Sequence, residues 1–257
     1  MVGTAIAFEN VSKRYGDHAA LAGVSLTIPA GQFVALVGAS GSGKTTLLKT
    51  INRLVVPDSG TVRLAGADAA AGPAYQLRRK IGYVFQEIGL FPHLTVAQNI
   101  AVTPKLLGWT PDRVAARVAG LLDLVALPAA LGARTPSELS GGQRQRVGVA
   151  RALAAEPGVL LMDEPFGALD PVTRDALGAD VGALHARLGL TTVMVTHDMT
   201  EAILLADRIV VLRAGAVIAD GTPAQLLAEA TDPDVRALVD APRRQAERLA
   251  ARLGPAS

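Results

Sequence analysis

The stretch that decides the fold is Phe33-Val34-Ala35-Leu36-Val37 followed by Gly38-Ala39-Ser40-Gly41-Ser42-Gly43-Lys44-Thr45. Its first five residues form a continuous apolar run, which is typical of a strand that is buried on both faces. Its last eight fit the pattern G-x-x-x-x-G-K-[ST], and the spacing of residues 46–54 predicts a helix after them. A strand, a glycine-rich loop and a helix in this order predict a loop whose backbone N–H groups bind phosphate.

The side chains of this loop have different predicted tasks. Lys44 would reach the β and γ phosphates of a nucleotide, and the Thr45 hydroxyl would ligate Mg²⁺. The alternative is a glycine-rich turn without a ligand, which the strand before it and the helix after it argue against. The predicted nucleotide-binding residues of this segment are Gly38, Ala39, Ser40, Gly41, Ser42, Gly43, Lys44, Thr45 and Thr46.

Two neighbouring acids follow a second apolar run. Residues 159–162 read Val-Leu-Leu-Met, and Asp163 and Glu164 come directly after them. Ligands collect at the carboxyl ends of strands in open α/β sheets, so both acids are candidates for the site. Because adjacent strand residues point to opposite faces, they can serve different purposes. Asp163 suits indirect binding of Mg²⁺, and Glu164 suits orienting and deprotonating an attacking water. Acids after a strand are also common as plain surface residues.

Composition indicates a globular chain and excludes some functions. Half of the 257 residues are hydrophobic and the net charge is only +2, so nothing favours nucleic acid as a partner. The absence of cysteine excludes disulfides and thiolate chemistry. No segment reaches the length of a membrane span and the amino terminus does not resemble a signal peptide, so we expect any spanning part to come from another chain.

Strand and helix patterns alternate along the chain. Short strands are expected at residues 6–8 and 24–28, an edge hairpin at 209–215, and mainly helices over 92–155. Residues 112–124 have helical spacing, and so does the tail from Pro223. This alternation predicts a mostly parallel sheet with an inserted helical lobe.

A second glycine-rich helix start lies at Leu139-Ser140-Gly141-Gly142-Gln143, before a helix predicted over residues 144–155. Ser140 and the glycines could bind an anion at this helix N-terminus. Because the segment has no lysine of its own and the chain already has one phosphate loop, it suggests a contact to nucleotide held by another copy. The sequence S-G-G before a helix is often only a cap, and that alternative stays open.

The segment at 139–143, followed by the strand that ends in Asp163 and Glu164, resembles the signature sequence of ABC ATPases. Further residues match the family's motifs from about residue 6 to residue 221. Tyr15 resembles the aromatic residue that stacks on adenine, and Gln86 resembles the glutamine that senses Mg²⁺, water and the transmembrane partner. Asp170, in Ala168-Leu169-Asp170, resembles the loop that communicates across a dimer, and His197 resembles the histidine that contacts the γ-phosphate.

The resemblance implies an α/β fold: a P-loop NTPase of ABC ATPase type with a mostly parallel core sheet, an antiparallel β subdomain and an inserted helical subdomain. The implied division is a core of residues 1–91 and 156–222, a helical subdomain of 92–155 and a tail of 223–257. The implied cofactors are ATP and Mg²⁺. Catalysis would use Glu164, His197, Lys44 and Gln86, and the metal would be held by Thr45, Gln86 and Asp163.

The resemblance also implies partners. Two copies would sandwich ATP head to tail, with Ser140, Gly141, Gly142, Gln143 and Asp170 contacting nucleotide. Permease subunits would span the membrane, a substrate-binding protein would act indirectly, and nucleic acid is not expected. The chain would lie peripherally on the cytoplasmic face of a bacterial inner membrane. DNA-repair and ribosome-acting relatives are the alternatives, but sustained heptads and a second phosphate loop are not found in the sequence.

Residues 85–95, 99–102 and 104–109 resemble the ATPase subunits of importers for quaternary-amine osmoprotectants such as glycine betaine, choline and carnitine. An importer for polar amino acids is the alternative. Many such subunits carry a carboxyl-terminal pair of regulatory CBS domains, and about 35 residues follow the core here. His18, His93 and His185 match no motif, and we expect them to be surface or loop residues.

Overall fold

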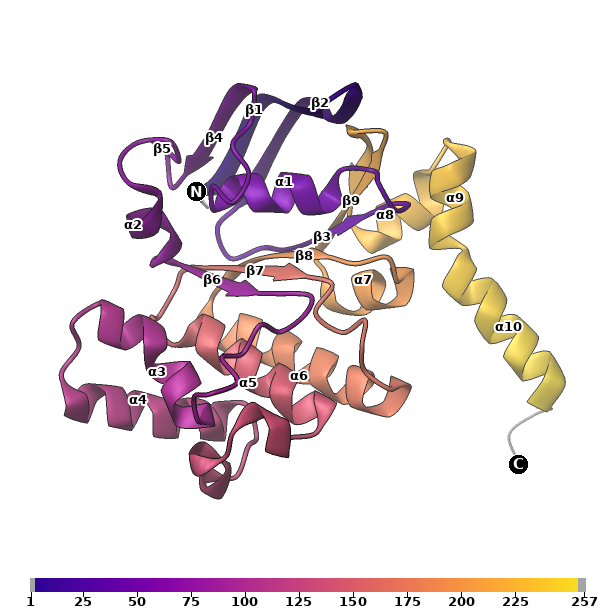
Figure 1. Ribbon diagram of the computed structural model, residues 1–257. Coiled ribbons are helices and arrows are strands. Elements are labelled where there is room, and N and C mark those ends of the chain that lie inside the picture. Colours follow the sequence, from indigo (N-terminus) through magenta and orange to yellow (C-terminus); the bar gives the residue numbers. More distant parts are fainter. Residues whose placement is uncertain (1–2, 254–257) are drawn as a thin grey trace.

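The computed structural model describes residues 3–253, which contain two β-sheets (Figure 1). The antiparallel sheet consists, in spatial order, of β2 (His18–Pro29), β1 (Thr4–Tyr15), β4 (Ser59–Leu64) and β5 (Ala67–Asp68). The central sheet consists, in spatial order, of β10 (Ala216–Gly221), β9 (Arg208–Arg213), β3 (Phe33–Val37), β8 (Thr191–Val195), β7 (Val159–Asp163) and β6 (Ile81–Val84). Its neighbouring strands are parallel except at the antiparallel edge strand β10. This topology confirms the predicted fold class.

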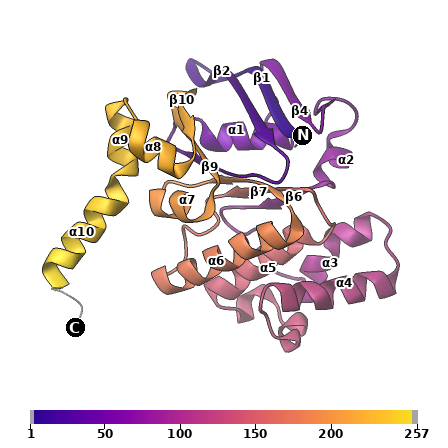
Figure 2. The same cartoon turned by 180° about the vertical axis from the view of Figure 1, so that it is seen from behind.

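The helices cover both faces of the central sheet. Helix α1 (Lys44–Ile51) lies between the two sheets (Figure 1). The larger group, on the opposite face, comprises α3 (Val96–Leu106), α4 (Pro111–Leu124), α5 (Gly141–Leu153), α6 (Pro171–Leu188) and α7 (Met199–Leu205), with two 3₁₀ turns at Ala129–Ala133 and Pro136–Glu138. Short α2 (Ala74–Arg78) precedes β6. The chain continues through α8 (Pro223–Glu229), α9 (Pro233–Val239) and α10 (Ala241–Leu253), and α10 projects from the body (Figure 2).

Two hydrophobic clusters meet at β3, whose five residues are all buried. Val34 and Leu36 belong to the cluster that includes α1 and the antiparallel sheet. Phe33, Ala35 and Val37 belong to the cluster built on α3 to α6. A strand covered on both faces has no solvent side for polar residues, which explains the continuous apolar run.

Several predicted boundaries are wrong. Strands β1 and β2 have 12 residues each, because polar residues occupy the exposed face of a hairpin that extends to Tyr15 and His18. Helix α5 begins at Gly141, three residues before its predicted start. There Ser140 Oγ accepts the Gln143 N–H while the Gln143 side chain accepts the Ser140 N–H, a capping box that begins the helix. Helix α1 ends at Ile51, and Arg53 at φ +57° cannot continue it.

Helices α3 to α5 and the two 3₁₀ turns fall within the predicted lobe of residues 92–155. Helices α8 to α10 fall within the predicted tail, of which residues 254–257 lie outside the described residues, as do residues 1–2. Over residues 3–253, no helix has both the length and the apolar character that crossing a membrane requires.

Candidate nucleotide site

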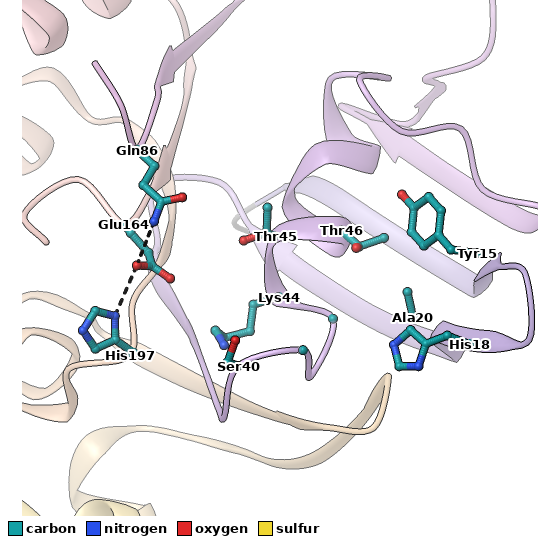
Figure 3. Close-up of a pocket in the computed structure, with 12 residues that line it drawn as sticks. Tyr15, His18, Ala20, Ser40, Lys44, Thr45, Thr46, Gln86, Glu164 and His197 are labelled. Atoms are coloured by element: carbon teal, nitrogen blue, oxygen red, sulfur yellow. Dashed lines mark hydrogen bonds and ion pairs between the residues drawn. The ribbon is translucent and has the colours of Figure 1, made fainter. Parts of the chain in front are cut away.

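A cavity of about 500 Å³ lies beside the loop that joins β3 to α1 (Figure 3). Its lining residues are Tyr15, His18, Ala20, Ser40, Gly41, Gly43, Lys44, Thr45, Thr46, Gln86, Glu164 and His197. Figure 3 shows Tyr15 and His18 at one end and Glu164 with His197 at the other, with Lys44 between them. The cavity is therefore elongated in the way that a base, a sugar and a chain of phosphates require.

The central sheet explains why these residues meet. The phosphate loop follows β3, Gln86 follows β6, Glu164 follows β7 and His197 follows β8. The four strands are parallel and adjacent in the order β3-β8-β7-β6, so their carboxyl ends share one edge. Residues far apart in sequence thus converge at the edge where α/β sheets bind ligands.

Two glycines of the loop occupy positions that exclude any side chain. Gly38 has φ +144°, and a Cβ there would lie 2.2 Å from the Leu212 carbonyl oxygen. Gly43 has φ +103°, and a Cβ there would lie 2.3 Å from the Ala20 carbonyl oxygen. Both φ values and both contacts require glycine, so the backbone can wrap closely around an anion.

Lys44 begins α1 and is buried. Its Nζ donates hydrogen bonds of 2.8 Å to the carbonyl oxygens of Gly38 and Ala39, across the mouth of the loop. Burial lowers the pKa of Lys44, while the nearby carboxylates of Glu164 and Asp163 act to raise it. A phosphate chain bound in the loop would place negative charge beside the ammonium group and so favour its charged form.

Asp163 is almost fully buried and has three polar neighbours. Its Oδ1 accepts a 2.9 Å hydrogen bond from the Thr45 hydroxyl, and its Oδ2 accepts one of 3.2 Å from the Tyr83 hydroxyl. Lys49 Nζ lies 3.3 Å from Oδ2. Burial and the Asp163 charge raise the pKa of Tyr83, so that its hydroxyl remains a donor. The sequence reasoning missed Tyr83 and Lys49, although Lys49 lies one turn after Thr45 on the same helix face.

Glu164 contacts two of the other three predicted catalytic residues, Gln86 and His197. Its Oε2 accepts a 3.3 Å hydrogen bond from Gln86 Nε2 and lies 3.3 Å from His197 Nδ1 (Figure 3). Glu164 has φ +46°, an uncommon conformation for a residue other than glycine, and its N–H donates to the Val195 carbonyl oxygen at 3.0 Å. The chain therefore leaves the strand direction at Glu164, and the carboxylate lines the cavity.

The expectation for the remaining histidines is wrong at one position, His185, whereas His18 is exposed as expected. His18 lines the cavity, because the tight turn at Gly16 and Asp17 places it opposite Tyr15 in the hairpin. A two-residue turn that begins with glycine is a readable hairpin signal, so its position could have been predicted. His185 is half-buried on α6, with Nδ1 2.9 Å from Thr192 Oγ1. His93 is exposed, as expected.

The cavity lining, among residues 3–253, includes none of the residues expected to contact nucleotide from the signature segment or from Asp170. Ser140 instead caps α5, and Asp170 caps α6 by accepting the Thr173 N–H at 3.0 Å. The two helix starts pack together, since a Cβ on Gly142 would lie 2.5 Å from Thr173 Cγ2.

A glycine-forced phosphate loop at the edge of a parallel sheet defines the class of P-loop nucleotide-binding proteins. The sequence profile of the ABC transporter family matches residues 21–167. The chain belongs to this family and is an ATP-binding, ATP-hydrolysing member of it.

Curated relatives agree with the family. The chain is 51% identical to the glycine betaine uptake system ATP-binding protein YehX of Escherichia coli K12, over 90% of this chain and 75% of that protein. It is 50% identical to the choline transport ATP-binding protein OpuBA of Bacillus subtilis, over 91% of this chain and 62% of that protein. It is also 50% identical to a sulfate/thiosulfate import ATP-binding protein, CysA of Thermosynechococcus vestitus, over 91% and 69%.

Among solved structures, the fold is similar to the ATP-binding cassette MJ0796, determined as a dimer in a post-hydrolysis state with ADP and Pi. The TM-score is 0.76 at 34% identity, and the match covers 84% of this chain and 98% of that one. The chain spans 62% of the length of OpuBA and 75% of the length of YehX. Identity to these relatives therefore does not by itself assign a cargo.

Proposed function

We propose that this chain hydrolyses ATP as the motor subunit of an importer and that Glu164 is the general base. The role of Glu164 as the base is supported by the position of its Oε2 atom, which lies 3.3 Å from both Gln86 Nε2 and His197 Nδ1 at one end of the cavity. ATP would lie with its base beside Tyr15 and its phosphates along residues 38–46. The γ-phosphate would then reach the end of the cavity where Glu164 and His197 lie.

The residues present fit Mg²⁺ as the metal. Mg²⁺ prefers oxygen ligands and binds through one or two protein groups together with substrate phosphates. The Thr45 hydroxyl and the Gln86 side-chain carbonyl would supply protein oxygens, and Asp163 would orient Thr45 through the 2.9 Å hydrogen bond. A cluster of three or more His, Asp or Glu side chains is not found in the described residues. When bound, the ion neutralises phosphate oxygens.

The chain's own groups would perform the proton transfer and stabilise charge. Glu164 would accept a proton from the water that attacks the γ-phosphorus atom, while the amide of Gln86 holds the carboxylate in position. His197 would donate a hydrogen bond to a γ-phosphate oxygen. Lys44 and the loop N–H groups would stabilise the negative charge on the phosphates, and the buried position of Lys44 strengthens that interaction.

Two copies would complete the site. We propose that Ser140, Gly141, Gly142 and Gln143 of one copy contact ATP bound to the loop of the other, with Asp170 near the junction. The exposed helix starts in this chain and the dimeric form of the similar cassette support this arrangement. Glu164→Gln with ATP should therefore elute as a dimer in size-exclusion chromatography. The matched variant Ser140→Arg, in the same background, should remain a monomer while still binding ATP, and a dimer there would contradict the arrangement.

The proposed cellular setting is the cytoplasmic face of a bacterial inner membrane, with permease subunits spanning it and a substrate-binding protein delivering cargo. The proposed division of labour keeps residues 1–91 and 156–222 as the core, 92–155 as the helical subdomain that contacts the permease, and 223–257 as the tail. The cargo we propose is a quaternary amine such as glycine betaine or choline. Relatives named for the uptake of glycine betaine and of choline support that proposal, together with residues 85–95, 99–102 and 104–109.

Sulfate or thiosulfate is a second candidate cargo, because the sulfate/thiosulfate relative is 50% identical over a similar length. This second candidate replaces the importer for polar amino acids, which was the alternative suggested by the sequence. Growth under salt stress with added glycine betaine tests the first candidate, and growth on sulfate as sole sulfur source tests the second. Deletion of the gene should abolish rescue by glycine betaine, and the gene carrying Glu164→Gln should fail to restore it. Loss of growth on sulfate with intact betaine rescue would favour the second cargo.

A further inference from the structure

The segment that carries Gln86 has an unusual backbone. The Ile88 N–H donates to the Phe85 carbonyl oxygen at 3.0 Å, closing a turn in which Gln86 and Glu87 are the two central residues. Ile88 then has φ +54° and Gly89 has φ +58°. A left-handed conformation is costly for a β-branched residue such as isoleucine, so contacts outside the turn must hold it.

Arg151 of α5 supplies such contacts. Its Nη2 donates to the Ile88 carbonyl oxygen and its Nη1 to the Gly89 carbonyl oxygen, each at 2.6 Å. Within residues 3–253, no carboxylate forms an ion pair with Arg151. The acceptors of its side-chain hydrogen bonds are these two backbone carbonyl oxygens. Burial lowers the pKa of Arg151, which agrees with a guanidinium group placed for backbone binding and not for pairing with an acid.

One turn earlier on α5, Gly148 receives the Ile88 side chain. A Cβ on Gly148 would lie 3.1 Å from Ile88 Cγ2, a tighter separation than side chains normally tolerate. Gly148 and Arg151 are three residues apart and so share one face of the helix. The turn is therefore attached to α5 at two points, an apolar one through the Ile88 side chain and a polar one through two carbonyls.

We infer that Arg151 is a positioning residue that fixes the Gln86 turn on α5, so that the Gln86 amide meets Glu164. The turn is held at one end by β6 and at the other by Arg151, and Gln86 lies between these two attachments. Helix α5 begins at Gly141 with Ser140 as its N-cap, so the same 13-residue helix carries the proposed contact to the second nucleotide at its start and the support of Gln86 near its end. The inference rests on the role proposed for Gln86.

The test compares Arg151→Met and Arg151→Lys with Arg117→Met in the full chain. Arg117 is a matched control, because it also donates two hydrogen bonds to backbone carbonyls, those of Leu153 and Ala154 at the end of α5. Arg151→Met should accelerate amide hydrogen exchange at Ile88 and lower kcat for ATP about ten- to a hundredfold with KM unchanged. Arg151→Lys should restore part of the protection from exchange at Ile88 and part of kcat. Arg117→Met should leave the exchange rate at Ile88 and kcat unchanged. Unaltered exchange at Ile88 in Arg151→Met would overturn the inference.

A double-mutant cycle separates the inference from the proposed function. If Arg151 acts through Gln86, adding Arg151→Met to Gln86→Ala should lower kcat little further. Fully additive losses would overturn the inference, because Arg151 would then act by another route. If Gln86→Ala alone keeps the wild-type kcat, the role proposed for Gln86 fails, and the exchange measurement at Ile88 still decides whether Arg151 holds the turn.

Discussion

The Thr45 hydroxyl donates a 2.9 Å hydrogen bond to Oδ1 of Asp163, which joins the phosphate loop to the end of β7 across 118 residues of sequence. The bond holds the two segments side by side at the carboxyl edge of the central sheet. Lys49 and Tyr83 complete the polar surroundings of this carboxylate, which is almost fully buried.

Asp163→Asn should therefore raise the Mg²⁺ concentration needed for half-maximal ATP hydrolysis by about ten- to a hundredfold, because residues that orient a metal ligand typically contribute that much. The measurement is ATPase rate against Mg²⁺ at saturating ATP. Asp123→Asn, an exposed acid on α4, is the control and should leave the curve unchanged. An unchanged Mg²⁺ requirement in Asp163→Asn would show that the Thr45–Asp163 contact does not serve the metal.

Glu164→Gln should lower kcat at least about a hundredfold while ATP binding persists, since a general base typically contributes at least that factor. Gln preserves the shape of the side chain and can still contact Gln86, but it cannot accept the proton. Single-turnover hydrolysis and equilibrium binding of a fluorescent ATP analogue measure the two properties separately. Glu87→Gln, an exposed acid in the neighbouring turn, should behave as wild type. Normal turnover by Glu164→Gln would remove the role assigned to it.

His18→Ala should raise KM for ATP by roughly three- to tenfold with kcat unchanged. His18 lies opposite Tyr15 in the hairpin at the end of the cavity away from Glu164, and one ring contact contributes about 0.5–1.5 kcal/mol. His93→Ala is the control, because His93 is exposed and does not line the cavity. A wild-type KM in both variants would show that His18 does not contribute to nucleotide binding.

Glu201 on α7 provides a prediction about pH. Burial raises its pKa, assisted by the Asp198 charge, although the Thr196 hydroxyl, Arg174 and His197 act to lower it. A carboxyl group with a raised pKa in the folded state binds more protons there than in the unfolded chain, so stability falls as pH rises from its ordinary value near 4.5 through the folded pKa.

The Glu201→Gln protein cannot titrate at this position. Its free energy of unfolding relative to wild type should therefore increase between pH 4.5 and pH 7. Urea unfolding of both proteins at the two pH values measures this difference, and other titrating groups cancel in the comparison. A difference that is constant with pH, or that decreases, would contradict the proposed protonation of Glu201.

The predictions for the central part of the site rest on local sequence patterns. The apolar residues 33–37, the glycines at 38 and 43 and the acids after residues 159–162 each have a local physical reason to be where they are, and the structure brings the loop, Gln86, Glu164 and His197 to one cavity. Tyr83, Lys49 and His18 were missed because their importance comes from neighbours. Tyr83 and Lys49 matter only once β6, β7 and α1 pack side by side, and His18 matters only once the hairpin closes.

The sequence by itself determined the phosphate loop, because glycine conformations and a buried strand follow from residue type and order. It also determined the alternation of strands and helices, since hydrophobic periodicity is a local property. Only the tertiary structure decided that Thr45 meets Asp163, that Glu164 stands between Gln86 and His197, and that Arg151 holds the Gln86 turn. These contacts join residues more than 30 positions apart, and their geometry depends on strand order and helix packing, which no local pattern specifies.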